Sequence, residues 1–205
     1  MSETTLSAEE LARANLYGLI ARLFYAAPDA ALLEEMARMQ APEPESPLGR
    51  AWAELVGTWR GAAPEALEDE HTTLFIGTGK AEVTPYVSHY VLRHSTDEPL
   101  VELREQLLRW GIGRRPGAFE PEDHFSALCE VMRYAIAVQQ RNLVEQRDFF
   151  RTFLYRGGVA FCDAVRDSEK ANFYRPLALL ARAFLEAENE AFALLPEESS
   201  RTTFR

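Results

Sequence analysis

The chain has 205 residues, of which 47% are hydrophobic and 26% are charged, a composition typical of a soluble globular protein with a sizeable core. Its net charge of −10 would repel a phosphate backbone, which argues against a nucleic-acid partner. The acidic excess lies in residues 1–70, with 13 acidic and 5 basic residues, and it favours a basic peptide as a partner, although solubility alone would also explain it.

The sequence also bears on the cellular compartment. No apolar run approaches the roughly 20 residues that a membrane-spanning helix needs, and no apolar core follows a basic start as it does in a signal peptide. The two cysteines, Cys129 and Cys162, lie in apolar helical patterns, which indicates buried free thiols and a reducing environment. We therefore expect a cytoplasmic protein without stable insertion into a membrane.

The first part of the chain predicts a series of helices separated by prolines. Residues 7–10 read Ser-Ala-Glu-Glu, which fits a capping box, and the apolar residues that follow recur at helical spacing. Each later proline predicts either the first turn of a helix or a loop. In chain order we expect a helix after Ser7, a short helix at 28–39, a stiff loop at 41–47, a helix at 48–60 and a helix at 64–75 that is closed by Gly77.

The second part of the chain has a more regular helical pattern. We expect a loop at 78–85, a helix at 98–110 closed by Gly111, a break at 112–121, and then three helices at about 125–139, 143–167 and 176–195. Gly157 and Gly158 interrupt the second of these three helices, at a cost of about 1 kcal/mol each relative to alanine. The pair suggests either a kink or the close approach of a neighbouring helix.

These patterns together predict an all-α fold. No segment has a convincing strand period, and glycines and prolines concentrate in the break near the middle of the chain. We expect a helical bundle in two halves, residues 1–111 and 124–205, which a hinge at 112–123 joins into one globular unit.

The sequence gives no sign of a catalytic or metal centre. No two of the four histidines form a His-x-x-x-His pair, and the Glu-x-x-His motif does not occur twice, as zinc and di-iron centres of these kinds require. P-loop, dinucleotide-binding and nucleophile-elbow motifs are also missing from the sequence. We therefore predict no catalytic residue, no metal site and no cofactor.

Two segments stand out instead, one apolar and one acidic. Residues 74–77 read Leu-Phe-Ile-Gly and residues 85–90 read Pro-Tyr-Val-Ser-His-Tyr, so large apolar and aromatic groups surround a loop. Residues 120–124 read Glu-Pro-Glu-Asp-His and precede an amphipathic helix. Acidic groups in a first turn stabilise a helix by about 0.3–1 kcal/mol each, so capping is one explanation of these carboxylates. Together the segments suggest a groove that holds a peptide, although the Leu-Phe pair could equally pack in the core.

In order and spacing, these segments resemble the signatures of the TorD-type chaperones, with the DmsD and NarJ branches, which mature molybdenum enzymes. The first family signature runs Leu-Phe-x-Gly, then a loop, then Pro-aromatic-x-Ser-x-Tyr, and the second is Glu-Pro-x-Asp-His. A third signature, Phe-Tyr near the start of the last helix, stands here at residues 173–174. With the all-helical pattern, the resemblance covers nearly the whole chain and implies a TorD-like fold.

The resemblance implies a cytoplasmic chaperone with no reaction of its own. Such proteins bind the twin-arginine leader, or another N-terminal segment, of an apo molybdoenzyme catalytic subunit, and they assist its folding, molybdopterin insertion and export proofreading. The identity of the client is left open, as is the choice between a monomer and a domain-swapped dimer, which a hinge with Pro116 and Gly117 would permit. By this resemblance, the residues expected to bind the peptide are Leu74, Phe75, Pro85, Tyr86, Tyr90, Pro121, Asp123 and His124.

Two other classes of function stay open from the sequence. His124 with an adjacent carboxylate could act as a base in an all-α metal-dependent hydrolase, and a metal analysis of the purified protein would test this alternative. The chain could also be a ligand-sensing helical regulator of another class. A client protein captured from the native cytoplasm would separate the chaperone from both alternatives.

Overall fold

The computed structural model describes residues 6–39, 43–77, 81–91, 99–113 and 121–196, and every regular element within these ranges is a helix. This confirms the predicted all-α fold. The elements are, in chain order, α1 (Ala8–Tyr25), α2 (Ala30–Arg38), α3 (Pro47–Trp59), α4 (Pro64–His71), a π-helical turn (Thr72–Ile76), α5 (Ser88–Val91), α6 (Pro99–Arg109), α7 (Phe125–Ala137), α8 (Leu143–Phe149), a second π-helical turn (Phe150–Tyr155), α9 (Arg156–Asp167) and α10 (Tyr174–Ala193).

Local sequence signals set several of the described helix ends. The predicted capping box is present, with the Ser7 side chain accepting a hydrogen bond from the Glu10 amide at 3.1 Å and the Glu10 carboxylate accepting from the Ser7 amide at 2.9 Å. Gly77 closes the α4 segment with φ of 62°, a conformation that glycine adopts without steric cost. The predicted helix at 64–75 therefore exists, but its last turn is π-helical rather than α-helical.

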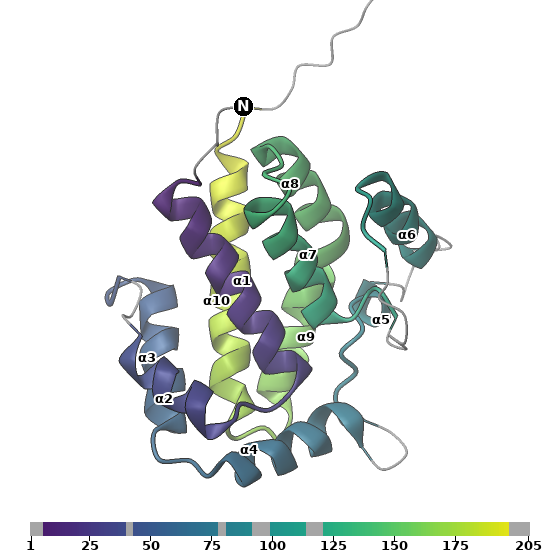
Figure 1. Ribbon diagram of the computed structural model, residues 1–205. Coiled ribbons are helices and arrows are strands. Elements are labelled where there is room, and N and C mark those ends of the chain that lie inside the picture. Colours follow the sequence, from purple (N-terminus) through teal and green to yellow (C-terminus); the bar gives the residue numbers. More distant parts are fainter. Residues whose placement is uncertain (1–5, 40–42, 78–80, 92–98, 114–120, 197–205) are drawn as a thin grey trace, which may run out of the picture.

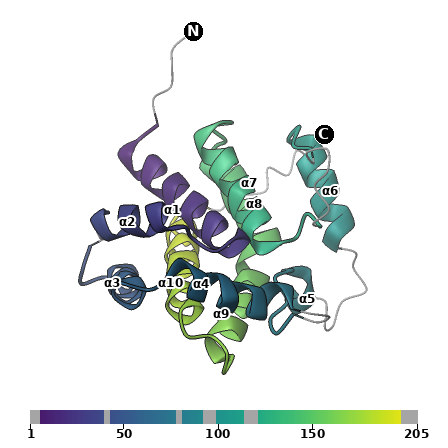
Figure 2. The ribbon, with the colours of Figure 1, turned by 60° about the horizontal axis from the view of Figure 1, so that its bottom comes forward.

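The helices pack as a bundle around α1, α7 and α10. In Figure 1, α1 crosses in front of α10 and runs beside α7, with α2 and α3 on one side of this group and α6 on the other. The turned view in Figure 2 shows α4 lying across the end of the bundle, near α9 and α10. The Glu70 carboxylate of α4 holds this end together, because it accepts hydrogen bonds of 2.8–3.0 Å from three successive amides at 172–174, where α10 begins.

One hydrophobic core contains residues from both sides of the predicted hinge. α1 packs most extensively against α7, and α3 packs against α10, so elements that precede residue 112 interleave with elements that follow residue 123. The single globular unit and its division into halves at 1–111 and 124–205 both stay predictions. Residues 114–120 of the predicted hinge lie outside the described residues, as do Pro116 and Gly117 within it, and parts of the predicted loops at 41–47 and 78–85.

The glycine pair at 157–158 marks a close approach between segments, which was one of the two sequence interpretations. A Cβ atom on Gly157 would lie 2.4 Å from Cγ1 and 2.6 Å from the carbonyl oxygen of Val87, and one on Gly158 would lie 3.0 Å from the Phe125 ring. The residues around Val87 therefore rest directly on the backbone of α9. The interruption of α-helical geometry comes earlier, in the π-helical turn that precedes α9.

Candidate functional site

The tertiary structure joins the two sequence motifs. An isolated antiparallel β-bridge pairs Tyr86 with His124. Two backbone hydrogen bonds, both of 2.9 Å, flank this bridge: the Val87 amide to the Asp123 carbonyl, and the Phe125 amide to the Pro85 carbonyl. The segment before α5 is therefore fastened through its backbone to the first turn of α7.

Asp123 strengthens the same junction through its side chain. The carboxylate is 5% exposed, and its Oδ2 accepts hydrogen bonds from the Ser88 hydroxyl at 2.5 Å and the Ser88 amide at 3.3 Å. Among the described residues, no group donates to the second carboxylate oxygen, Oδ1. A buried carboxylate oxygen without a hydrogen-bond donor is unfavourable. Asp123 therefore links the two motifs through Oδ2, and its Oδ1 can still accept a hydrogen bond.

The interpretation of the acidic pair as a helix cap is wrong. The N-cap of α7 is His124, whose Nδ1 accepts a hydrogen bond of 3.2 Å from the Ser126 amide. Asp123 faces Ser88 instead, and Glu122 pairs with Arg104 of α6 at 3.1 Å. A histidine nitrogen has taken the position that a carboxylate was expected to hold, and both acids bind neighbouring segments instead.

A groove opens beside this junction, between the last turns of α1 and the first turns of α7. It has a volume of about 350 Å³, and its wall on the α7 side begins with His124, which is 9% exposed and whose ring meets the Tyr86 ring edge-on at 5.7 Å between centroids. The residues that line the groove are Gly18, Ala21, Arg22, Tyr25, His124, Ser126, Ala127 and Glu130. The small residues Gly18, Ala21 and Ala127 leave this space unfilled, and the larger side chains form its border.

The groove is largely apolar, with charged groups that are already engaged. Arg22 donates to the carbonyl of Ala26 at 2.8 Å, which caps the end of α1. Glu130 holds the Arg133 guanidinium at 2.5–2.9 Å. Tyr25 is 67% exposed and offers an uncovered ring at the edge of the groove. Such a surface suits an apolar side chain with little need for a charged partner.

The structure gathers some of the predicted peptide-binding residues and separates others. Pro85, Tyr86, Asp123 and His124 meet at the bridge, with Pro121 adjacent, because its carbonyl accepts from the His124 amide at 3.3 Å. Tyr90 is half-buried behind this cluster, and its hydroxyl donates to the Thr84 carbonyl at 2.8 Å. Burial raises the pKa of Tyr90 to about 12, so the phenol stays protonated and continues to donate.

Leu74 and Phe75 lie in the core beneath the site. Leu74 is fully buried, and the Phe75 ring is 8% exposed and packs against Phe24 at 5.8 Å. Phe24 in turn meets Phe125, the first residue of α7, at 5.3 Å. The Leu74 carbonyl also accepts from the Val83 amide at 2.9 Å, which anchors the segment that leads to the bridge. Direct contact of these two residues with a peptide stays a prediction.

Sequence reasoning missed several residues of this region. Tyr25, Arg22 and Ser126 line the groove but belong to no motif, and no sequence signal would have placed α1 beside α7. Ser88 stands within the Pro-aromatic-x-Ser-x-Tyr signature, and the short polar side chain beside an aromatic cluster could have suggested a partner for a buried acid.

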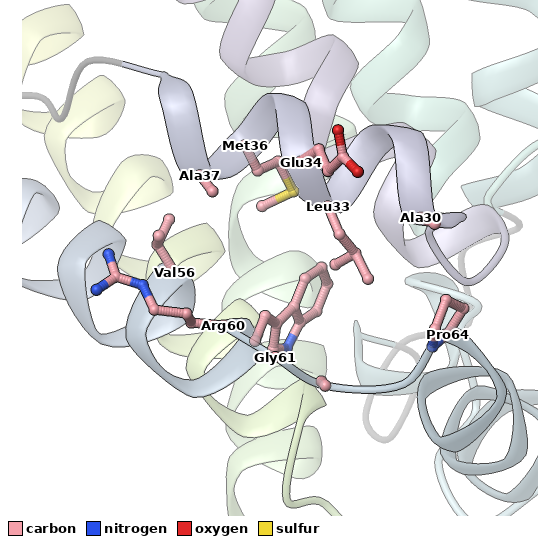
Figure 3. A pocket seen from close by; sticks show the side chains of 11 residues that line it. Ala30, Leu33, Glu34, Met36, Ala37, Val56, Arg60, Gly61 and Pro64 are labelled. Atoms are coloured by element: carbon pink, nitrogen blue, oxygen red, sulfur yellow. The ribbon is translucent and has the colours of Figure 1, made fainter.

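Other hollows exist in the described part of the chain. One of about 280 Å³ lies between α2 and α3, where Leu33 and Met36 reach from α2 toward the loop at Gly61 while the Glu34 carboxylate turns the other way (Figure 3). A wider apolar one of about 860 Å³ runs between α1, α2, α3 and α10. A third, of about 360 Å³, lies between α6 and α8 and carries more charged side chains. None of the residues predicted to bind a peptide lines these three hollows.

Within the described ranges, no group of three or more His, Cys, Asp or Glu side chains could hold a metal ion. Cys129 and Cys162 are buried free thiols, as the sequence predicted, and burial raises the pKa of both. A thiol held protonated in this way is a poor nucleophile. Among the described helices, none combines the length and the apolar character that crossing a membrane requires.

Comparison with known proteins relates the chain to one protein family and to one solved structure. The sequence profile of the nitrate reductase delta subunit family matches residues 41–163. Among solved structures, the chain is similar to a protein from Archaeoglobus fulgidus described as a candidate redox enzyme maturation protein, with a TM-score of 0.54 and 21% sequence identity over 91% of this chain and 99% of that chain. At this identity the likeness supports the fold. No curated protein matches the chain.

Proposed function

The chain belongs to the nitrate reductase delta subunit family, and from this premise we propose that it is a maturation chaperone for a redox enzyme. It binds the N-terminal segment, a twin-arginine leader, of the apo catalytic subunit of a molybdopterin-dependent oxidoreductase in the cytoplasm. It assists folding and cofactor insertion and delays export until both are complete. It carries out no reaction itself.

One observation carries this proposal: the two sequence signatures join at a bridge, and one member of that bridge lines a groove. The bridge between Tyr86 and His124 joins the signatures, and His124 lines the apolar space between α1 and α7. The position of the paired signatures beside an open space supports a role in binding in addition to their role in the fold.

The chemistry of the groove matches an apolar peptide stretch with a basic end. Apolar side chains of the client would bury themselves against Ala21, Ala127 and the exposed ring of Tyr25, gaining roughly 25 cal/mol per Å² of buried apolar surface. The basic end would be attracted by the net charge of −10, which acts mainly on the association rate and on specificity.

In this proposal the predicted residues have two different roles. Tyr86 and His124 border the bound segment, and Pro85 and Pro121 keep the backbone around them rigid. Asp123 orients this border through Ser88 and offers Oδ1 to a donor from the client. Leu74, Phe75 and Tyr90 support the border from beneath, since their side chains are buried or half-buried.

Isothermal titration calorimetry with the N-terminal peptide of the molybdoenzyme catalytic subunit captured with this protein tests the proposal. Tyr25→Ala should weaken binding about fivefold to thirtyfold, because a buried aromatic contact is worth roughly 1–2 kcal/mol. The matched control is Tyr134→Ala on α7, which is also exposed, at 37%, but does not line the groove. Both variants should fold normally because their rings are exposed.

Three results would count against the proposal: no measurable binding by the wild type, equal affinity in the Tyr25 variant and the wild type, or equal losses in the Tyr25 and Tyr134 variants. Truncation of Leu74 is a poor test of binding, because removing a fully buried leucine side chain costs about 2–5 kcal/mol of stability.

A further inference from the structure

A serine at the groove has a hydroxyl group without a partner. Ser126 lines the space between α1 and α7, yet the residue is only 4% exposed. Among the described residues, none forms a hydrogen bond with its Oγ. A buried hydroxyl left in this state lowers the stability of the fold, a cost that alanine at this position would avoid.

The other polar groups at this end of the groove are engaged within the protein. The Ser126 amide donates to His124 Nδ1 at 3.2 Å, and the Leu128 amide donates to the His124 carbonyl at 3.0 Å. Arg22 is bound to the carbonyls that follow α1, and Glu130 is bound to Arg133. The Ser126 hydroxyl can therefore change partners without breaking a hydrogen bond of the protein.

The electrostatic setting selects the kind of partner. Ser126 stands in the first turn of α7, a helix of 13 residues, where the helix dipole is positive and favours an acceptor over a cation. Glu130 follows one turn later on the same face, since residues four apart are neighbours on a helix, and it disfavours a full negative charge. A neutral acceptor with a partial negative charge satisfies both conditions.

The walls of the groove narrow the choice further. Gly18, Ala21 and Ala127 are small and apolar, so a ligand can bring its own main chain close to α7. A main-chain carbonyl oxygen is neutral and is a strong acceptor that must find a donor when it leaves water. The Ser126 Oγ is itself enclosed in the free protein, and a rotation about χ1 to another staggered position would bring it to such a ligand.

Resting on the proposed function, we propose that the Ser126 hydroxyl is the polar anchor of the groove and donates a hydrogen bond to a main-chain carbonyl oxygen of the bound client segment. The anchor fixes the register of the segment, while the apolar walls supply most of the binding energy. It also explains why a polar residue stands at a buried position where nothing in the free protein uses it.

The test uses Ser126→Ala and the same client peptide in calorimetry. Because the free protein loses no hydrogen bond, its melting temperature should stay equal to that of the wild type or rise, while the affinity for the peptide should fall about threefold to tenfold. A purely structural role would lower the melting temperature instead, and that result would overturn the proposal.

A second arm identifies the atom that the hydroxyl binds. Client peptides in which one backbone amide at a time is replaced by an ester carry one weakened carbonyl acceptor each. One position should lose affinity against the wild type and lose much less against Ser126→Ala, which a double-mutant cycle measures. If the ester at every position has the same effect in both proteins, no main-chain carbonyl meets Ser126 and the proposal fails.

The outcomes separate this proposal from the one that it rests on. If Ser126→Ala binds within twofold of the wild type while Tyr25→Ala is weakened, the groove is the binding site but the carbonyl anchor is refuted. If the wild type binds no client peptide, both proposals fall together.

Discussion

The substitution Gly157→Ala tests the close contact between Val87, which belongs to the first motif, and the backbone of α9. The new Cβ would lie 2.4 Å from Cγ1, 2.6 Å from the carbonyl oxygen of Val87, and 3.0 Å from Cγ2 of Val91. The methyl of a flexible side chain could give way, but the carbonyl oxygen belongs to the backbone beside the bridge. The whole segment that begins α5 must therefore shift away from α9.

The magnitude follows from two opposing effects. Alanine is favoured over glycine in a helix interior by about 1 kcal/mol. Overpacking a buried contact typically costs about 1–3 kcal/mol, and occasionally more, and two approaches of the new Cβ here lie under 3.0 Å, so that something must shift. Because a backbone atom is among those approached, we place the cost in the upper part of this range, at about 2–3 kcal/mol. The net destabilisation is then about 1–2 kcal/mol, which lowers the melting temperature of a chain of this length by roughly 2–8 °C.

Thermal unfolding followed by circular dichroism measures the effect, with Gly57→Ala as the matched control. Gly57 lies in α3, and a Cβ there would have no atom within 4 Å, so the control should gain up to about 1 kcal/mol from helix propensity alone. The two variants carry the same chemical change and should move in opposite directions. Equal stabilisation by both substitutions would refute the inference that Val87 rests on the α9 backbone.

Two further predictions concern buried polar groups. Glu188, 4% exposed, accepts from Arg13 at 2.7 and 2.8 Å, and the Arg13 side chain is 13% exposed. Glu188→Gln should therefore cost about 2–3 kcal/mol in urea unfolding, because it leaves this partly buried guanidinium without its ion partner. Glu34→Gln in an exposed pair should cost at most about 1 kcal/mol; equal costs would contradict this. Burial lowers the pKa of His71, so the unfolded chain binds more protons than the folded chain. The contribution of His71 to stability is therefore fully present above the unfolded pKa of about 6.5. It should be lost as the pH falls through that value and toward the folded pKa. His71→Gln should flatten this decline in unfolding free energy relative to wild type; an identical decline in both proteins would exclude His71 as its source.

The limits of sequence reasoning appear at particular residues. The acids before α7 were interpreted as caps because acidic groups suit the start of a helix. In the structure His124 caps α7, and Asp123 bonds to Ser88, which comes 35 residues earlier in the chain. Helix propensity describes only the interactions within a helix. Ser88, which is distant in the chain, donates two hydrogen bonds to Asp123 instead.

Local signals in the sequence determined the helical elements of this protein. The capping box at Ser7, the left-handed glycine at residue 77 and the buried cysteines depend on neighbours within a few residues or on a helical period, so the linear order of side chains contains them. The glycine pair at 157–158 indicated a close approach, since a residue without Cβ leaves room for another backbone.

Only the tertiary structure decided which of these elements form a site. The bridge between Tyr86 and His124, the burial of Leu74, and the groove between α1 and α7 all depend on segments that are distant in the chain. Their positions follow from how apolar faces of whole helices pack together, because the core is shared by α1, α7 and α10 at once. No short stretch of sequence contains that information, since the packing energy belongs to the assembled bundle and not to any one helix.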